Sequence, residues 1–338
     1  DEIYLLDNMQ YIFLCSNQFS GSLSGEIGNL DNLIELSLCD NQFSGTLPES
    51  LYSLSNLQVL DLDSNELSGT ISESIGNLTY LYMLSVGNND LTGTIPESLY
   101  SLTNLEYIWL YWNELGGSIS DSISNLIDLR IFDLNDNNFS GTIPESLYSL
   151  SHLESLWLPG NQFSGSISES IGNMKEISDL NLAGNNFTGA IPGMLYTLSE
   201  LKYLDLGYNQ LSGSILSDIG NLTNLNTLNL SENNLSGYIP NSICNLTKLD
   251  WSSDWNSGEN SYIYSNNLCP PYPECIENDV GYQEPLDCSE SPDEFSFNQS
   301  SSQAFYFVMS ATDMYTAPLE IGDWIGLFND DICVGSRK

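Results

Sequence analysis

The sequence predicts an α/β solenoid of similar coils, followed by a small β-rich C-terminal module. The first observation is an asparagine that recurs every 24 residues, without insertion, from Asn17 to Asn233. The second is that leucines and other apolar residues keep the same spacing around each of these asparagines. The third is that cysteines and strand-like runs replace this period after residue 250. A fixed period of this length is typical of chains in which each repeat forms one coil and neighbouring coils share a core.

Each repeat reads L-x-x-L-x-L-x-x-N-x-[LF]-[ST]-G-x-[IL]-[PS], as around Leu60, Leu62 and Asn65. Strand side chains alternate between two faces, so both leucines of L-x-L point inward and the residue between them points outward. The asparagine ends the strand, where its amide can satisfy main-chain groups of the turn, and the glycine permits the next turn. Stacked coils then carry a predicted ladder of Asn17, Asn41, Asn65, Asn89, Asn113, Asn137, Asn161, Asn185, Asn209 and Asn233.

This spacing, together with the "LSGxIP" signature, resembles leucine-rich repeats of the plant-specific type. Such repeats occur in plant receptor ectodomains, in polygalacturonase inhibitors and in some exported bacterial proteins. The resemblance covers roughly residues 5–250. It implies a right-handed, curved leucine-rich-repeat solenoid with a parallel sheet on the concave side and mostly irregular or 3-10 segments on the convex side.

A second period of 48 residues lies within the first. It is carried by the prolines Pro48, Pro96, Pro144, Pro192 and Pro240 and by the tyrosines Tyr52, Tyr100, Tyr148 and Tyr196. This alternation indicates an ancestral duplication of a pair of coils. The favoured interpretation is that the tyrosines pack in the core or at its edge; the alternative is a surface ladder used in assembly, with tyrosines roughly 10 Å apart.

Three domains are predicted: a solenoid of ten coils over residues 1–250, a disulfide-stapled terminal coil and linker over 251–290, and a partial β-sandwich-like module over 291–338. The last segment resembles a C-terminal module of large exported proteins of marine bacteria, through its "FNQS", "QAFYF" and "DWIG" runs. A terminal coil held by cysteines would cover the last layer of the solenoid. The preferred disulfide pairs are Cys244 with Cys269 and Cys275 with Cys288, although sequence alone leaves the connectivity open.

Composition limits the partners and the location. Forty-five acidic residues against six basic ones give a net charge of −39, which disfavours nucleic acids and anionic membrane surfaces and favours cations and basic partners. No run of 18 apolar residues is present that would insert in a membrane.

The seven cysteines lack Cys-x-x-Cys spacing and indicate disulfides of an extracellular or cell-surface protein. No metal site and no cofactor are predicted, although calcium on the acidic surface is left open. Cys15 and Cys39 occupy equivalent positions in adjacent coils, and either a disulfide or free thiols fit this placement.

The outward strand positions form the predicted binding face. The residue four before each ladder asparagine varies between coils, whereas the leucines hardly change. Aromatic residues beside carboxylates suit a glycan or a basic, partly apolar protein segment, through stacking, cation–π contacts and hydrogen bonds. The alternative is that aromatic residues, which are good strand formers, only cover the sheet. The candidate ligand-binding residues are Tyr107, Trp109, Tyr111, Trp112, Asp133, Asp136, Trp157, Asp61 and Asp63.

The favoured function is recognition or adhesion through binding of a protein or glycan on the concave face. The alternative is a structural subunit of an extracellular filament, joined through the solenoid ends and the C-terminal module, because both Asp1 and Lys338 interrupt a pattern. Ice binding through rows of Thr, Ser and Asn is less favoured, because the outward column of the predicted strand is no repeated Thr row.

No catalytic motif supports an enzyme. The single histidine, His152, falls in a position that is usually on the surface, and no G-x-S-x-G, H-E-x-x-H or phosphate-binding glycine loop is present. Asp61 and Asp133 are three coils apart, which predicts a separation of about 14 Å, too far for the carboxylate pair of a glycosidase. The protein is therefore predicted to bind rather than to catalyse.

Overall fold

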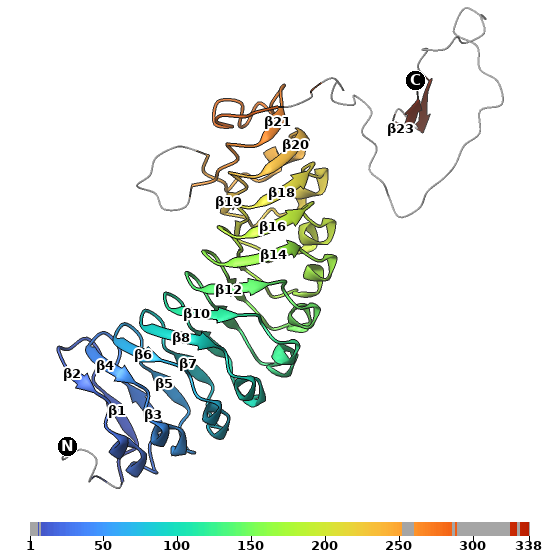
Figure 1. Ribbon diagram of the computed structural model, residues 1–338. Coiled ribbons are helices and arrows are strands. Elements are labelled where there is room, and N and C mark those ends of the chain that lie inside the picture. Colours follow the sequence, from blue (N-terminus) through green and yellow to red (C-terminus); the bar gives the residue numbers. More distant parts are fainter. Residues whose placement is uncertain are drawn as a thin grey trace, which may run out of the picture. The chain divides into compact units, whose positions relative to one another are not determined.

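The computed structural model describes residues 6, 8–251, 260–285 and 288, together with the backbone of two strands at 325–329 and 332–337. The chain divides into two compact units, Asp1–Leu286 and Asp287–Lys338, which are described separately. Ten coils of the first unit each contain a strand, a second strand and a 3-10 helix in that order, and the coils stack into a curved solenoid (Figure 1). The predicted leucine-rich-repeat solenoid is confirmed for this unit.

The first sheet contains ten parallel strands of three residues each, paired in sequence order with a constant shift of 24 residues. The middle residue of each strand, such as Leu60 or Ile108, points into the core, and the first and third point outward. The strands are β1 (Tyr11–Phe13), β3 (Glu35–Ser37), β5 (Val59–Asp61), β7 (Met83–Ser85), β9 (Tyr107–Trp109), β11 (Ile131–Asp133), β13 (Ser155–Trp157), β15 (Asp179–Asn181), β17 (Tyr203–Asp205) and β19 (Thr227–Asn229).

A second parallel sheet of eleven strands occupies the segment after each ladder asparagine, where the sequence predicted only a turn and an extended bend. A glycine recurs in this segment of ten coils, and glycine disfavours a strand, so the sequence did not indicate this sheet. Glycines such as Gly69 (φ 81°) adopt a left-handed conformation within these strands. The strands are β2 (Ser20–Ser22), β4 (Gln42–Thr46), β6 (Glu66–Gly69), β8 (Asp90–Thr94), β10 (Glu114–Gly117), β12 (Asn138–Gly141), β14 (Gln162–Ser166), β16 (Asn186–Gly189), β18 (Gln210–Gly213), β20 (Asn234–Tyr238) and β21 (Asn267–Cys269).

One 3-10 helix of five residues follows in each of ten coils and runs along the outer, convex edge (Figure 1). Several begin with a serine cap, as where Ser72 Oγ accepts a hydrogen bond from the Ser74 N–H, and others begin after a proline. These short turns are the only helices of the described part, so none could span a bilayer. They are η2 (Gly25–Asn29), η3 (Glu49–Ser53), η4 (Glu73–Asn77), η5 (Glu97–Ser101), η6 (Asp121–Asn125), η7 (Glu145–Ser149), η8 (Glu169–Asn173), η9 (Gly193–Thr197), η10 (Ser217–Asn221) and η11 (Asn241–Asn245).

One continuous apolar core runs between the two sheets and the 3-10 helices. Neighbouring coils also stack phenylalanines, since Phe163 lies 6.3 Å from Phe139 and 6.4 Å from Phe187 between ring centroids. The four tyrosines of the 48-residue period are at most 2% exposed, which confirms their interpretation as core residues and excludes a surface ladder.

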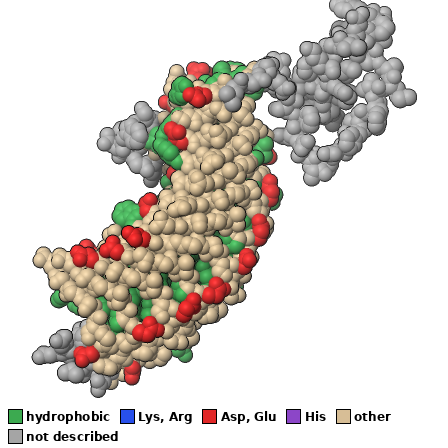
Figure 2. Space-filling view, viewed as in Figure 1, with side chains coloured by type: hydrophobic (Ala, Val, Ile, Leu, Met, Phe, Trp, Pro, Cys, Tyr) green, Lys and Arg blue, Asp and Glu red, His purple; other side chains and the backbone are tan. Residues whose placement is uncertain are grey.

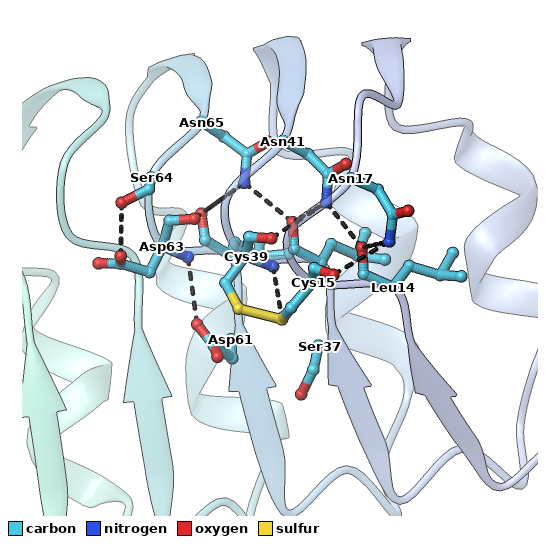
Figure 3. The surroundings of a disulfide bond; sticks show 12 residues. Leu14, Cys15, Asn17, Ser37, Cys39, Asn41, Asp61, Asp63, Ser64 and Asn65 are labelled. Carbon is cyan, nitrogen blue, oxygen red and sulfur yellow. Dashed lines mark hydrogen bonds between the residues drawn. A yellow bond between two sulfur atoms is a disulfide. The ribbon is translucent and has the colours of Figure 1, made fainter.

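The ladder asparagines connect adjacent coils. Asn89 Nδ2 donates to the carbonyls of Val86 and Gly87 in its own coil (3.2 and 2.9 Å) and of Leu62 in the preceding coil (3.0 Å). Its Oδ1 accepts from the Leu67 N–H at 2.9 Å. Figure 3 shows the same pattern for Asn41 and Asn65. Asn266, which was outside the predicted ladder, makes the equivalent contacts beyond the irregular segment.

Two disulfides staple the ends of the solenoid. Cys15 and Cys39 are bonded across adjacent coils, as Figure 3 shows. Cys244 is bonded to Cys275, so both preferred pairs, Cys244 with Cys269 and Cys275 with Cys288, are wrong. The physical reason is the register of the terminal coil: Tyr238 pairs with Cys269, and six residues after each lie Cys244 and Cys275. This disulfide therefore joins equivalent positions of two layers, and Cys269 and Cys288 are also disulfide-bonded.

The second unit contributes β22 (Ile325–Asn329) and β23 (Ile332–Arg337), which pair as an antiparallel hairpin. The rest of the predicted module over 291–338 lies outside the described residues. So does the side chain of Cys333.

Candidate functional site

The first sheet places the predicted ligand-binding residues in two sets. Tyr107 and Trp109 begin and end β9, Asp61 ends β5, Asp133 ends β11 and Trp157 ends β13. The second set lies in the turns that follow these strands: Asp63, Tyr111, Trp112 and Asp136. Both sets are on the outward side of the sheet, next to the asparagine ladder.

The centre of this face is a row of three side chains at one register level, named here the Trp–Asp–Trp row. Asp133 is the register partner of Trp109 on one side and of Trp157 on the other. Adjacent parallel strands are about 4.8 Å apart, so the two tryptophans start about 10 Å apart with the carboxylate between them. All three side chains are partly exposed.

Each tryptophan of the row is held by a stacked tyrosine. Trp109 stacks on Tyr107 with ring centroids 5.5 Å apart and an interplanar angle of 5°. Trp157 stacks on Tyr203 at 5.3 Å and 17°, and its Nε1–H donates to Ser155 Oγ at 2.9 Å. Tyr203 was missed by the sequence analysis, because its contact with Trp157 crosses an intervening strand, β15. These contacts fix both indoles before any ligand arrives.

Burial perturbs the Asp133 carboxyl. Its pKa is raised to about 6, first by burial and further by the nearby negative charge of Asp136, and the hydrogen bond from the Asn135 N–H opposes this. That N–H lies 2.9 Å from Asp133 Oδ1. A carboxylate in this setting is incompletely solvated and gains from a cationic partner.

A second aromatic pair borders the row. Trp112, 53% exposed, packs edge-on against Tyr111 with ring centroids 6.0 Å apart. Trp112 Nε1–H donates to Asp136 Oδ2 at 2.8 Å. Tyr111 also reaches across Gly87 toward Asp63, where a Cβ on residue 87 would lie 2.8 Å from the tyrosine ring and 2.7 Å from Asp63 Oδ1. Glycine at this position therefore allows the two side chains to approach.

The carboxylates near the N-terminal disulfide differ in their environment. The pKa of Asp61 is raised, chiefly by burial, whereas Asp63 faces the Tyr111 hydroxyl, whose pKa is raised first by burial and then by this carboxylate. A carboxylate oxygen of Asp61 lies within 4.8 Å of both sulfurs of the Cys15–Cys39 disulfide (Figure 3). Thiolates bind metals, whereas these sulfurs are bonded to each other, so this group forms no metal site in the disulfide state. Calcium binding on the acidic surface stays a prediction.

The second sheet presents a different surface. Ser or Thr lies three and five residues after most ladder asparagines, with Gly116, Ala190 and Tyr238 as exceptions, and the first strand positions are Asn or Gln in the C-terminal half. Figure 2, in the same view as Figure 1, shows this broad face as mostly uncharged, with acidic side chains along its edges. These rows were not predicted from the sequence, because the pattern indicated a turn and an extended bend in this segment and no strand. The exposed or partly exposed members in the C-terminal half are Ser140, Thr142, Ser164, Ser166, Thr188, Ser212, Ser214 and Ser236.

A small polar pocket of about 280 Å³ lies at the start of the first four strands of the first sheet and contains none of the predicted binding residues. It is lined by Gln10, Asn32, Ile34, Asn56, Gln58 and Tyr80.

Comparison with known protein families agrees with this architecture. Two leucine-rich-repeat family models match, one at residues 55–115 and the other at 32–54, 128–150, 152–174, 200–222 and 224–246. Together they span more than half of the sequence. The chain belongs to the leucine-rich repeat proteins.

Solved structures of other leucine-rich repeat proteins place it with the plant type. The plant peptide hormone receptor RGFR1, in complex with RGF2, is 31% identical with a TM-score of 0.72, over 82% of this chain and 47% of the receptor chain. The Arabidopsis receptor kinase HAESA, in complex with the peptide hormone IDA and the co-receptor SERK1, is 29% identical with a TM-score of 0.58, over 84% of this chain and 58% of HAESA. A plant ice-binding protein is 29% identical with a TM-score of 0.65, over 78% of this chain and 83% of that protein.

The match thus spans about half the length of the two receptor structures. No curated protein matches the sequence.

Proposed function

We propose that this leucine-rich repeat protein is an extracellular or cell-surface recognition protein that binds an extended protein segment on its concave face. The observation that carries the proposal is the set of partly exposed aromatic side chains beside carboxylates on that face. Aromatic side chains supply most of the binding energy in many protein interfaces when they are already held in place. Here Tyr107 and Tyr203 hold the two tryptophans of the Trp–Asp–Trp row.

The backbone beneath this face is rigid. Ten strands in one parallel sheet and an asparagine ladder with contacts in adjacent coils fix the relative positions of outward side chains. A ligand that lies along the solenoid axis then meets one new coil about every 4.8 Å. An extended polypeptide, with about 3.3 Å per residue, can present side chains to successive coils.

Two further observations support the class of ligand and the location. RGFR1 and HAESA, which share the solenoid, are in complex with peptide hormones. Disulfides persist mainly in oxidising compartments, and both ends of the solenoid carry them. Binding alone accounts for this face, and the proposal assigns it no catalytic step.

The test is a selection of displayed random 12-residue peptides on the intact protein. We expect binders whose affinity falls at least tenfold in the double variant Trp109→Ala/Trp157→Ala, since each large aromatic anchor contributes about 2 kcal/mol or more. The matched control is Thr142→Ala/Thr188→Ala on the second sheet, which should leave binding unchanged. Peptides that bind both double variants equally would contradict a concave-face site. A glycan array that gives tight, Trp-dependent binding without any peptide binder would move the proposal to the glycan class.

A second candidate function concerns the second sheet. Ser, Thr, Asn and Gln side chains recur along this sheet and form a repeated polar surface of the kind expected for ice binding, and a plant ice-binding protein shares the fold. Ice recrystallisation in the presence of the protein tests this directly. Inhibition that is lost on Thr142→Tyr/Thr188→Tyr, with the Trp109→Ala/Trp157→Ala variant as control, would support it; no inhibition would remove it.

The filament alternative stays a prediction. It depends on the first residues of the chain and on the C-terminal module, most of which lie outside the described residues.

A further inference from the structure

We propose that the Trp–Asp–Trp row binds one arginine side chain of the protein segment on the concave face. This inference rests on the proposed function and names the chemistry that its ligand must carry. The row consists of Trp109, Asp133 and Trp157, which are consecutive register partners on β9, β11 and β13.

The Asp133 carboxylate has acceptor capacity left. Among the described residues, Oδ1 accepts one hydrogen bond, from the Asn135 N–H, and Oδ2 accepts none. A carboxylate has about four lone-pair positions and can accept two parallel hydrogen bonds from a guanidinium. Because the side chain is partly exposed, a ligand can reach it from the concave side.

Among the described residues, no cation of the chain itself pairs with Asp133. Arg130, on the same coil, is held between Glu106 (Nε to Oε2, 3.3 Å) and Glu154 (Nη1 to Oε1, 2.6 Å) of the two adjacent coils. The negative charge of Asp136 further raises the pKa of Asp133, and Asp136 is itself hydrogen-bonded by Trp112. A cation supplied by a ligand would therefore meet an uncompensated negative site.

The aromatic flanks favour a planar cation. A guanidinium can lie against an indole face while it donates to a carboxylate in the same plane, whereas an ammonium is a compact, strongly hydrated point charge. Trp109 and Trp157 are the register partners of Asp133 on either side, and each is stacked on a tyrosine. A neutral sugar could stack on one indole, but it would leave the partly buried charge of Asp133 uncompensated.

Asp205 is an internal control for this arrangement. It occupies the equivalent position on β17, and its Oδ1 accepts a hydrogen bond from the Gly207 N–H at 2.9 Å, as Asp133 does from Asn135. Its register partners are Asn181 and Asn229 in place of tryptophans. Its Oδ2 already accepts a hydrogen bond from the Tyr203 hydroxyl at 3.4 Å. The geometry thus predicts arginine binding at Asp133 and none at Asp205.

The experiment runs the random-peptide selection in parallel on the wild-type protein, Asp133→Asn and Asp205→Asn. We expect arginine to be enriched at one peptide position with the wild-type protein and with Asp205→Asn, and to lose that enrichment with Asp133→Asn. A selected peptide is then synthesised with arginine, citrulline or lysine at that position. Citrulline has the same shape as arginine without its charge, and it should bind at least tenfold more weakly to the wild-type protein. For Asp133→Asn, arginine and citrulline peptides should bind alike.

The outcomes separate the two proposals. Concave-face binders without a preferred cation, or an arginine preference that survives Asp133→Asn, would overturn this inference and leave the proposed function standing. Equal binding of the citrulline and arginine peptides would also overturn it. The absence of any concave-face binder would overturn both. A lysine peptide that binds as tightly as the arginine peptide would contradict the role of the flanking indoles.

Discussion

Replacement of Asn137 by alanine tests the physical account of the solenoid most directly. The side chain is 8% exposed and contacts two coils. Its Nδ2 donates to the carbonyls of Leu134 (3.2 Å) and Asn135 (3.1 Å) in its own coil and of Leu110 (3.0 Å) in the preceding coil. Its Oδ1 accepts from the Leu115 N–H at 3.0 Å.

The magnitude follows from what the truncation leaves unpaired. The Leu110 carbonyl keeps a hydrogen bond from Asn113, and the Leu134 carbonyl keeps one from Asn161. The Leu115 N–H, in a buried residue, loses its acceptor. One orphaned buried donor costs about 1–3 kcal/mol and each other lost hydrogen bond about 1 kcal/mol at most, so we expect a loss of about 2–4 kcal/mol.

The neighbouring residue provides the matched control. Asn138 is the same residue type, one position further along, and its side chain is exposed on β12. Asn138→Ala should therefore change the free energy of unfolding by less than about 0.5 kcal/mol. Urea unfolding of both variants, followed by circular dichroism, measures the difference through the midpoint at constant m value.

Equal losses in the free energy of unfolding for Asn137→Ala and Asn138→Ala would refute the reasoning, because the ladder hydrogen bonds would then contribute no more than an exposed asparagine does. A change below about 0.5 kcal/mol for Asn137→Ala would refute it as well. The first ladder position gives a further check: Asn17 is exposed and donates only within its own coil, to the carbonyls of Leu14 and Cys15. Asn17→Ala should cost clearly less than Asn137→Ala.

Three other expectations follow. Asp133 has a pKa of about 6 in the folded protein, raised by burial and by Asp136, so its stabilising contribution is present below about pH 4 and is lost as the pH rises through about 6. Relative to wild type, Asp133→Asn should therefore gain up to about 3 kcal/mol between pH 4 and 7.5 in urea titrations, and a pH-independent difference would contradict this. Among the described residues, the buried Tyr148 hydroxyl makes no hydrogen bond of good geometry and only approaches the backbone of Ser168, so Tyr148→Phe should leave the thermal midpoint unchanged or raise it, and a fall of several degrees would contradict this. Reduction of the Cys244–Cys275 disulfide, which closes a loop with a sequence separation of 31, should lower the stability of the terminal coil by about 2–4 kcal/mol, seen as faster amide exchange in β21 than in β9.

The repeat made most of the fold predictable. A 24-residue period with fixed leucine positions determines the stacked coils, the first sheet and the asparagine ladder, because every coil must bury the same face against the same neighbours. The sequence also indicated which outward residues form the candidate ligand face, through the variation at Trp109, Asp133 and Trp157.

The tertiary structure decided what depends on residues in different coils. The second sheet forms because stacking brings Ser44 beside Glu66 and the equivalent residues of other coils together, although ten of these segments carry a glycine that disfavours a strand. The same reason explains the stacking of Tyr203 on Trp157 and the bond between Cys244 and Cys275. The sequence by itself thus determined the architecture, because each repeat carries its apolar residues at the same positions and therefore buries the same face. Only the stacked coils determined the contacts around the candidate site and the cysteine pairing, because both depend on the register between neighbouring coils and on how far each side chain reaches across them.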